Sequence, residues 1–74
     1  MKYNLKWENI YSGETGYVCK VLKSKGYFVN TYAKEDAKKY VSRSAAQKDI
    51  EVLEDLGEAE NNNFFIEEAY MFLD

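Results

Sequence analysis

Hydrophobic and polar residues alternate along residues 2–11, the first segment of the chain. Tyr3, Leu5 and Trp7 share one parity, and the positions between them are polar. A period of two over this length predicts a half-buried β-strand. The next residues, 12–16, contain two glycines and predict a hairpin loop.

Two further strands are predicted after this loop. Residues 17–24 are rich in strand-forming side chains, although their alternation is imperfect, and residues 27–32 form a similar run. Lys25-Gly26 lies between them and predicts a tight reversal. Because short turns join neighbouring strands antiparallel, the three segments predict a meander.

The main helix is predicted to begin near Ser42 or Ser44 and to end at Gly57. Ser44 followed by Gln47 matches a capping box, and Gly57 stands where a left-handed residue would end the helix. Residues 34–40 permit a helix but are too few for more than a turn or two. The apolar stripe consists of Ala46, Ile50, Leu53 and Gly57.

The last segment, residues 64–73, follows a polar loop at 61–63 and fits two structures. A strand places Phe64, Ile66, Tyr70 and Phe72 on one face, whereas a helix capped by Asn63 aligns Phe65, Ala69 and Phe72. The strand is favoured, because the helix before it needs a sheet to complete a two-layer core. The sequence therefore predicts an α+β fold in which a three-stranded antiparallel meander, one main helix and a C-terminal strand follow in the order β-β-β-α-β. We expect residues 1–74 to form a single domain.

Composition argues against catalysis and metal binding. The 74 residues include no histidine and one cysteine, Cys19, so no Cys-His nucleophile, intrachain disulfide or zinc shell of histidine and cysteine can form. We expect Cys19 to be a small buried hydrophobe in a reducing compartment. The sequence indicates no enzyme, metal or cofactor. It also contains no apolar run of membrane-spanning length and no apolar signal segment, so we expect a cytoplasmic location.

The charge distribution is strongly asymmetric although the net charge is only −3. Residues 1–48 hold all ten Lys and Arg residues with four acids, giving +6, whereas residues 49–74 hold nine acids and no base, giving −9. Acids at the end of a helix also oppose its dipole, by about 0.3–1 kcal/mol each. A local rule that is broken without local compensation indicates a functional constraint.

Two interpretations of these acids remain open. They could face solvent or pair with lysines such as Lys20, Lys23 or Lys38, which would make them structural. They could instead form a surface for a partner protein with a basic groove, because complementary charge provides specificity and fast association. The candidate partner-binding residues are Asp49, Glu51, Glu54, Asp55, Glu58 and Glu60.

Nucleic-acid binding and self-association are the alternatives. Bases and rings are interleaved in Lys2-Tyr3, Lys6-Trp7 and Lys38-Lys39-Tyr40, as in sheets that bind single strands. The core of a small domain needs those rings, however, and the acidic half would repel phosphate. Gly13 and Gly16 match a nucleotide-clamping GxxG spacing, but their place between two strands favours a hairpin. A homodimer through an exposed sheet edge is the third hypothesis.

The chain resembles the short accessory proteins encoded by phages and prophages of AT-rich bacteria. The resemblance consists of its size, its abundant Lys, Asn, Tyr and Glu, and its lack of proline. Such proteins are often dedicated inhibitors, and some anti-CRISPR proteins block a nucleic-acid-binding groove by mimicking phosphate charge. The resemblance implies a non-enzymatic inhibitor of a host protein, with the six acids offered to a basic groove.

Overall fold

The computed structural model describes residues 2–69 of the chain. These residues form a four-stranded sheet, one α-helix and three short 3₁₀ turns. The strands are β1 (Lys2–Asn9), β2 (Thr15–Leu22), β3 (Tyr27–Thr31) and β4 (Asn62–Ala69). The helix is α1 (Arg43–Asp55), and the turns are η1 (Lys23–Lys25), η2 (Lys34–Asp36) and η3 (Glu58–Glu60).

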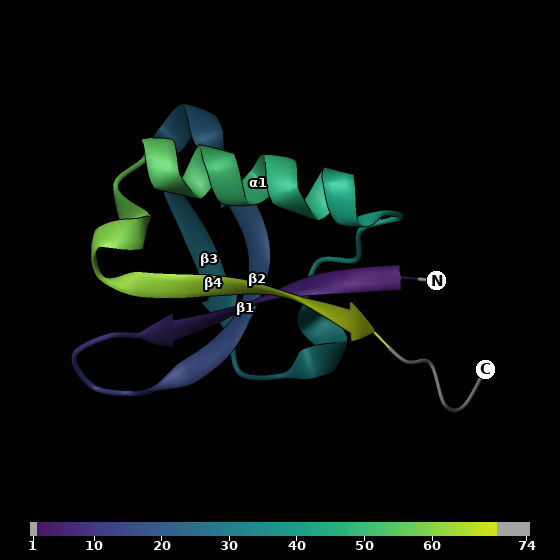
Figure 1. Cartoon of the computed structure of the whole chain (residues 1–74), viewed down its shortest axis with the longest axis horizontal. Coiled ribbons are helices and arrows are strands. Elements are labelled where there is room, and N and C mark those ends of the chain that lie inside the picture. Colours follow the sequence, from purple (N-terminus) through teal and green to yellow (C-terminus); the bar gives the residue numbers. More distant parts are fainter. Residues whose placement is uncertain (1, 70–74) are drawn as a thin grey trace.

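The sheet has the strand order β3-β2-β1-β4, and every neighbouring pair is antiparallel. β1, β2 and β3 form the predicted meander, and β4 returns after α1 to pair with the free side of β1 (Figure 1). The predicted α+β class and the order β-β-β-α-β are confirmed. β1 is thus a central strand, and β3 and β4 are the two edges.

The last strand begins earlier than predicted, inside the segment 61–63 that the sequence indicated as a loop. β4 begins at Asn62, so Asn62 and Asn63 belong to the strand and are not loop residues. Phe64 and Ile66 face the core as the strand prediction requires. The helical alternative is wrong for residues 64–69, and residues 70–73 lie outside the described part of the chain.

A β-bulge explains the imperfect alternation of residues 17–24. The pairing of β2 with β3 shifts between Val18 and Lys20, which leaves Cys19 as the extra residue. Val18 and Val21 consequently both pack into the core although their parity differs. Cys19 is half-buried at this bulge, so the prediction of a buried thiol is wrong.

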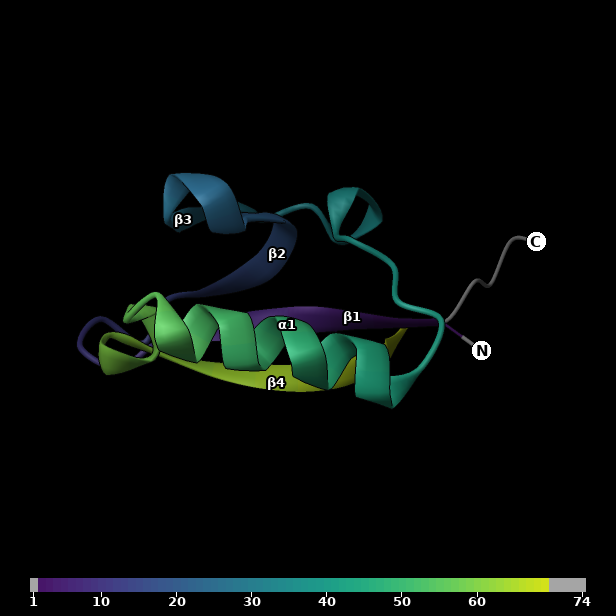
Figure 2. The ribbon, with the colours of Figure 1, turned by 90° about the horizontal axis from the view of Figure 1, so that it is seen from above.

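The sheet is curved so that side chains of its two edge strands meet over the core. Phe28 of β3 and Phe64 of β4 meet edge to face, with their ring centroids 5.7 Å apart. α1 lies over β1 and β4, on the inner side of this curve (Figure 2). The core consists of Leu5, Trp7, Val18, Tyr40, Ala46, Ile50 and Leu53.

The caps of α1 differ partly from the prediction. Ser42 is the N-cap, because its hydroxyl accepts a hydrogen bond from the amide of Ala45 at 3.2 Å. The capping box at Ser44 and Gln47 is therefore not formed. Gly57 follows the helix with φ +83°, the left-handed conformation that was predicted to end it.

The segment between η2 and α1 fills the space where β1 and β2 diverge. β1 pairs with β2 only over Lys6–Glu8. Tyr40 takes the place of β2 beside Tyr3, with two backbone hydrogen bonds of 2.9 and 2.8 Å. The amide of Lys38 donates to the carbonyl of Val18 at 2.9 Å. Residues 38–40 thus connect two strands that would otherwise leave backbone groups unpaired.

Candidate functional site

Asp49 differs from the other five candidate acids because it has structural partners. Its carboxylate accepts a hydrogen bond from the Tyr40 hydroxyl and forms an ion pair with Lys38, whose Nζ is 3.0 Å from Oδ2. The ammonium of Lys38 also lies 5.0 Å from the centroid of the Tyr40 ring. Burial, and then the nearby Asp49 carboxylate, raise the pKa of Tyr40 above its usual value. Asp49 therefore fixes the segment 38–40 to α1, as the pairing interpretation predicted for Lys38.

The other five acids point away from the core. Glu51, Glu54, Asp55 and Glu60 are exposed, and Glu58 is half-exposed. No described base forms an ion pair with any of them. We call Glu51, Glu54, Asp55, Glu58 and Glu60 the acidic surface.

Helix geometry brings three members of the acidic surface to one side. Glu51 lies three and four positions before Glu54 and Asp55, so its side chain neighbours both along the last turns of α1, and Glu58 follows in η3 after the left-handed Gly57. The last turn of α1 contains no base that would offset the partial negative charge of its free carbonyls. Like charges are therefore gathered where the helix dipole disfavours them.

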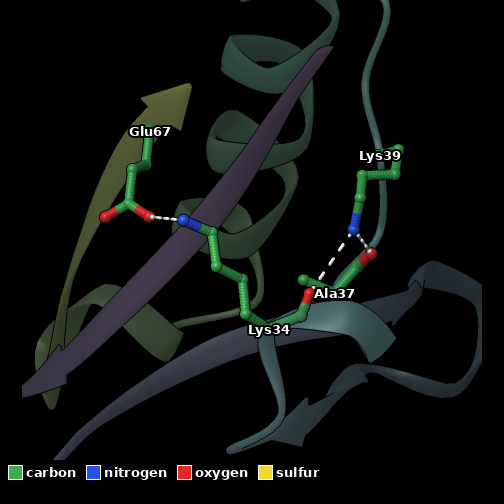
Figure 3. A network of polar contacts seen from close by, with 4 residues as sticks. All are labelled: Lys34, Ala37, Lys39 and Glu67. Atoms are coloured by element: carbon green, nitrogen blue, oxygen red, sulfur yellow. Dashed lines mark hydrogen bonds and ion pairs between the residues drawn. The ribbon is translucent and has the colours of Figure 1, made fainter. Parts of the chain in front are cut away.

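Lys34, Lys39 and Arg43 make contacts around the segment between η2 and α1. Lys34 reaches across β1 to Glu67 of β4, with its Nζ 3.3 Å from the carboxylate (Figure 3). Lys39 donates to the carbonyls of Lys34 and Ala37 at 3.4 and 3.1 Å (Figure 3). The Arg43 guanidinium lies 5.3 Å from the centroid of the Tyr3 ring. Lys34 thus connects η2 to β4 and Arg43 connects the start of α1 to β1, whereas Lys39 stabilises the chain around η2 locally.

The remaining bases are spread over several elements. Lys20, on β2, and Lys23 and Lys25, on η1, are exposed, as are Lys2 at the start of β1 and Lys48 on α1. Among the aromatic residues that lie next to Lys or Arg in the sequence, Trp7 and Tyr40 are only 4% and 5% exposed, so they cannot stack on nucleobases. The acidic surface thus lies on α1 and η3, whereas these exposed bases are divided among β1, β2, η1 and α1.

The GxxG spacing lies in the hairpin between β1 and β2. Asn9 begins this turn, because its side-chain oxygen accepts from the amides of Tyr11 and Ser12 at 2.9 Å. Gly13 has φ +75°, and Gly16 lies within β2. The Tyr32 hydroxyl donates to Glu14 at 3.0 Å, and this hydrogen bond raises the pKa of Tyr32. A carboxylate in the turn disfavours a phosphate there.

Asn4 is a buried polar residue that the alternation did not predict. It lies opposite Glu67 in the pairing of β1 with β4, and its side chain is fully buried. Neither its Nδ2 nor its Oδ1 has a hydrogen-bond partner among the described residues. The period of β1 placed Asn4 on a solvent-facing side, and only the folded chain reveals that this side is covered.

Comparison with known proteins identifies no relative. No protein-family model, curated protein or solved structure is significantly similar to this chain. Within residues 2–69, no cluster of three or more carboxylate or thiol side chains is arranged to hold a metal ion. Among the same residues, no helix has both the length and the apolar character needed to cross a membrane.

Proposed function

We propose that this protein is a small, non-enzymatic binding module that engages a partner protein through its acidic surface. The observation that carries the proposal is the set of five carboxylates, from Glu51 to Glu60, without ionic partners on and after α1. Asp49 is left out, because Tyr40 and Lys38 occupy its carboxylate. The partner of matching chemistry is a protein with a basic groove.

A groove that binds nucleic acid fits this description best. Such a groove presents Lys and Arg to phosphates, and exposed carboxylates without ionic partners offer it negative charge in their place. Binding there would prevent nucleic acid from entering. The proposal is therefore an inhibitor of a host protein that handles nucleic acid, in accordance with the resemblance to small phage proteins.

The test is capture of a partner by two variants that carry the same change in net charge. In E54Q/D55N/E58Q the centre of the acidic surface loses three charges. In the control, E14Q/E35Q/D36N, three exposed acids outside α1 and η3 are neutralised, one in the turn between β1 and β2 and two in η2. Both variants should remain folded by circular dichroism, because all six side chains lie outside the core.

We expect the parent and the control to retain the same protein from a nuclease-treated lysate of the organism that carries the gene. E54Q/D55N/E58Q should lose it, and the parent should release it as salt is raised. Equal capture by both variants would refute the role of the acidic surface. If the captured protein is recovered only without nuclease treatment, nucleic acid replaces the basic groove as the proposed binding partner.

A further inference from the structure

The two edges of the sheet differ in how well they are protected. β3 is short, with five residues, and the bulge at Cys19 distorts the strand beside it. β4 has eight residues in unbroken register with β1 and contains no Lys, Arg, Pro or bulge. Short strands, charged side chains (lysine above all), prolines and bulges are features that keep an edge from pairing with another chain. β4 is long and regular and has no lysine or proline, and its charged residues are the two glutamates Glu67 and Glu68.

β4 therefore has backbone groups available for a further strand. Among residues 2–69 its only strand partner is β1. In an antiparallel pair, alternate residues direct their N–H and C=O groups away from the partner strand. Phe65, at the middle of β4, is 46% exposed on the face opposite α1. An incoming strand would cover this ring and pair with the backbone.

Charge indicates which kind of strand fits. Glu58 and Glu60 belong to η3, which contacts β4 near its beginning, and neither forms an ion pair with a described base. Near the end of β4, Glu67 is already paired with Lys34. Opposite charges and aromatic to β-branched pairs both stabilise neighbouring strands. The best complement is a strand with lysine or arginine at the end beside η3 and a β-branched residue at its centre.

From this geometry we infer that β4 is a docking edge for an extended basic segment of the partner, which is added to the sheet as a fifth strand beside Phe65. The inference rests on the proposed function, because it assigns a conformation to the partner segment that the carboxylates attract. It adds that the recognition is made by backbone hydrogen bonds as well as by charge.

The test uses the ¹⁵N-labelled full chain and three capped seven-residue peptides. The first alternates Lys and Val, the second has Glu in place of each Lys, and the third is the Lys peptide N-methylated at its central residues. N-methylation removes donors and leaves charge and side chains unchanged. Titration by NMR gives both the affinity and the residues that respond.

We expect the Lys peptide to shift the amides of β4 and β1, and to slow hydrogen exchange at alternate β4 amides, with β3 unaffected. The Glu peptide should not bind, and N-methylation should weaken binding at least about tenfold. Equal affinity for the N-methylated peptide would overturn strand addition but leave charge recognition intact. Absence of binding by the Lys peptide would also overturn strand addition at β4. The proposed function would then still be tested separately, by capture of the partner with E54Q/D55N/E58Q and its control.

A matched pair of variants locates the edge. Phe65 and Tyr27 are both 46% exposed and lie on opposite edge strands. F65T should reduce affinity for the Lys peptide by about fivefold, because the central contact is lost, whereas Y27T should leave it unchanged. Tryptophan fluorescence checks that both variants are folded. Equal effects of the two substitutions would refute the assignment to β4.

Discussion

Gly16 is the position where a single added methyl group should disturb the core most directly. A Cβ atom placed on Gly16 would lie 2.6 Å from Cζ2, 2.8 Å from Cε2 and 2.9 Å from Nε1 of Trp7. All three distances are shorter than the contacts that a Cβ atom makes with other heavy atoms in proteins. The indole cannot move away easily, because it is 4% exposed, donates to the carbonyl of Tyr17 at 3.2 Å and contacts the Tyr32 ring.

The expected cost follows from this geometry. Overpacking a close-packed site destabilises a protein by about 1–3 kcal/mol. A domain of this size has roughly 3–5 kcal/mol of stability without disulfides or metals. With a urea dependence of about 1 kcal/mol per molar, Gly16→Ala should lower the unfolding midpoint by roughly 1–3 M.

The chain provides its own probe, because Trp7 is its single tryptophan. Urea unfolding followed by Trp7 fluorescence and by circular dichroism should show the lower midpoint in G16A. In a W7F background, followed by circular dichroism alone because the tryptophan is gone, the added methyl group meets a smaller ring, so the same substitution should cost less than about 1 kcal/mol. An equal cost in both backgrounds would refute the close approach of the indole to Gly16.

Three further predictions concern α1 and the segment before it. Asp49→Ala should lower the free energy of unfolding by about 1–3 kcal/mol, since it leaves the Tyr40 hydroxyl without its partner. Glu51→Ala should change it by less than about 0.5 kcal/mol. Similar losses for the two variants in urea unfolding would refute the structural role assigned to Asp49. The raised pKa of Tyr40 stabilises the fold fully below about pH 10, where unfolded tyrosine is neutral. Above that pH Tyr40 ionises first in the unfolded chain, so the free energy of unfolding falls. Tyr40→Phe should therefore show a shallower fall in stability than the parent between pH 10 and 11, and parallel stability curves for the two proteins would refute this role of Tyr40. Asp55→Lys should raise stability by about 0.3–1 kcal/mol by favouring the helix dipole, and an unchanged or lower thermal midpoint would be the opposite result.

The elements that periodicity defines were predicted correctly from the sequence. The alternation of Tyr3, Leu5 and Trp7 identified the inner face of β1, and the stripe of Ala46, Ile50 and Leu53 identified the buried face of α1. These patterns succeed because side-chain direction depends on local backbone geometry alone.

The predictions that failed depended on contacts between distant segments. The polarity of Asn62 and Asn63 indicated a loop, but pairing with β1 extends the strand over both residues. Asn4 had the parity of a solvent-facing position, and it is buried because a later segment covers that face. Local preference is overruled in each case by long-range structure.

The acidic candidates were separable only in three dimensions. Asp49 and Glu51 look equivalent in the sequence, two positions apart on one helix. The structure distinguishes them, because Lys38 and Tyr40 meet Asp49 after the chain has passed over β1 and β2. The sequence offers Lys38 as one possible partner for an acid, but only the path of residues 38–40 identifies Asp49 as that acid.

The pairing of the first strand with the last one determines how this chain folds as it is synthesised. β1 gains its second neighbour only from β4, about sixty residues later, so the sheet closes through its most distant contacts. The loop that must close is long, although the entropy of closure grows slowly with length. A nascent chain that ends before β4 therefore leaves one side of β1, next to Leu5 and Trp7, without its partner strand, and we expect the sheet to be completed only when β4 is available to pair.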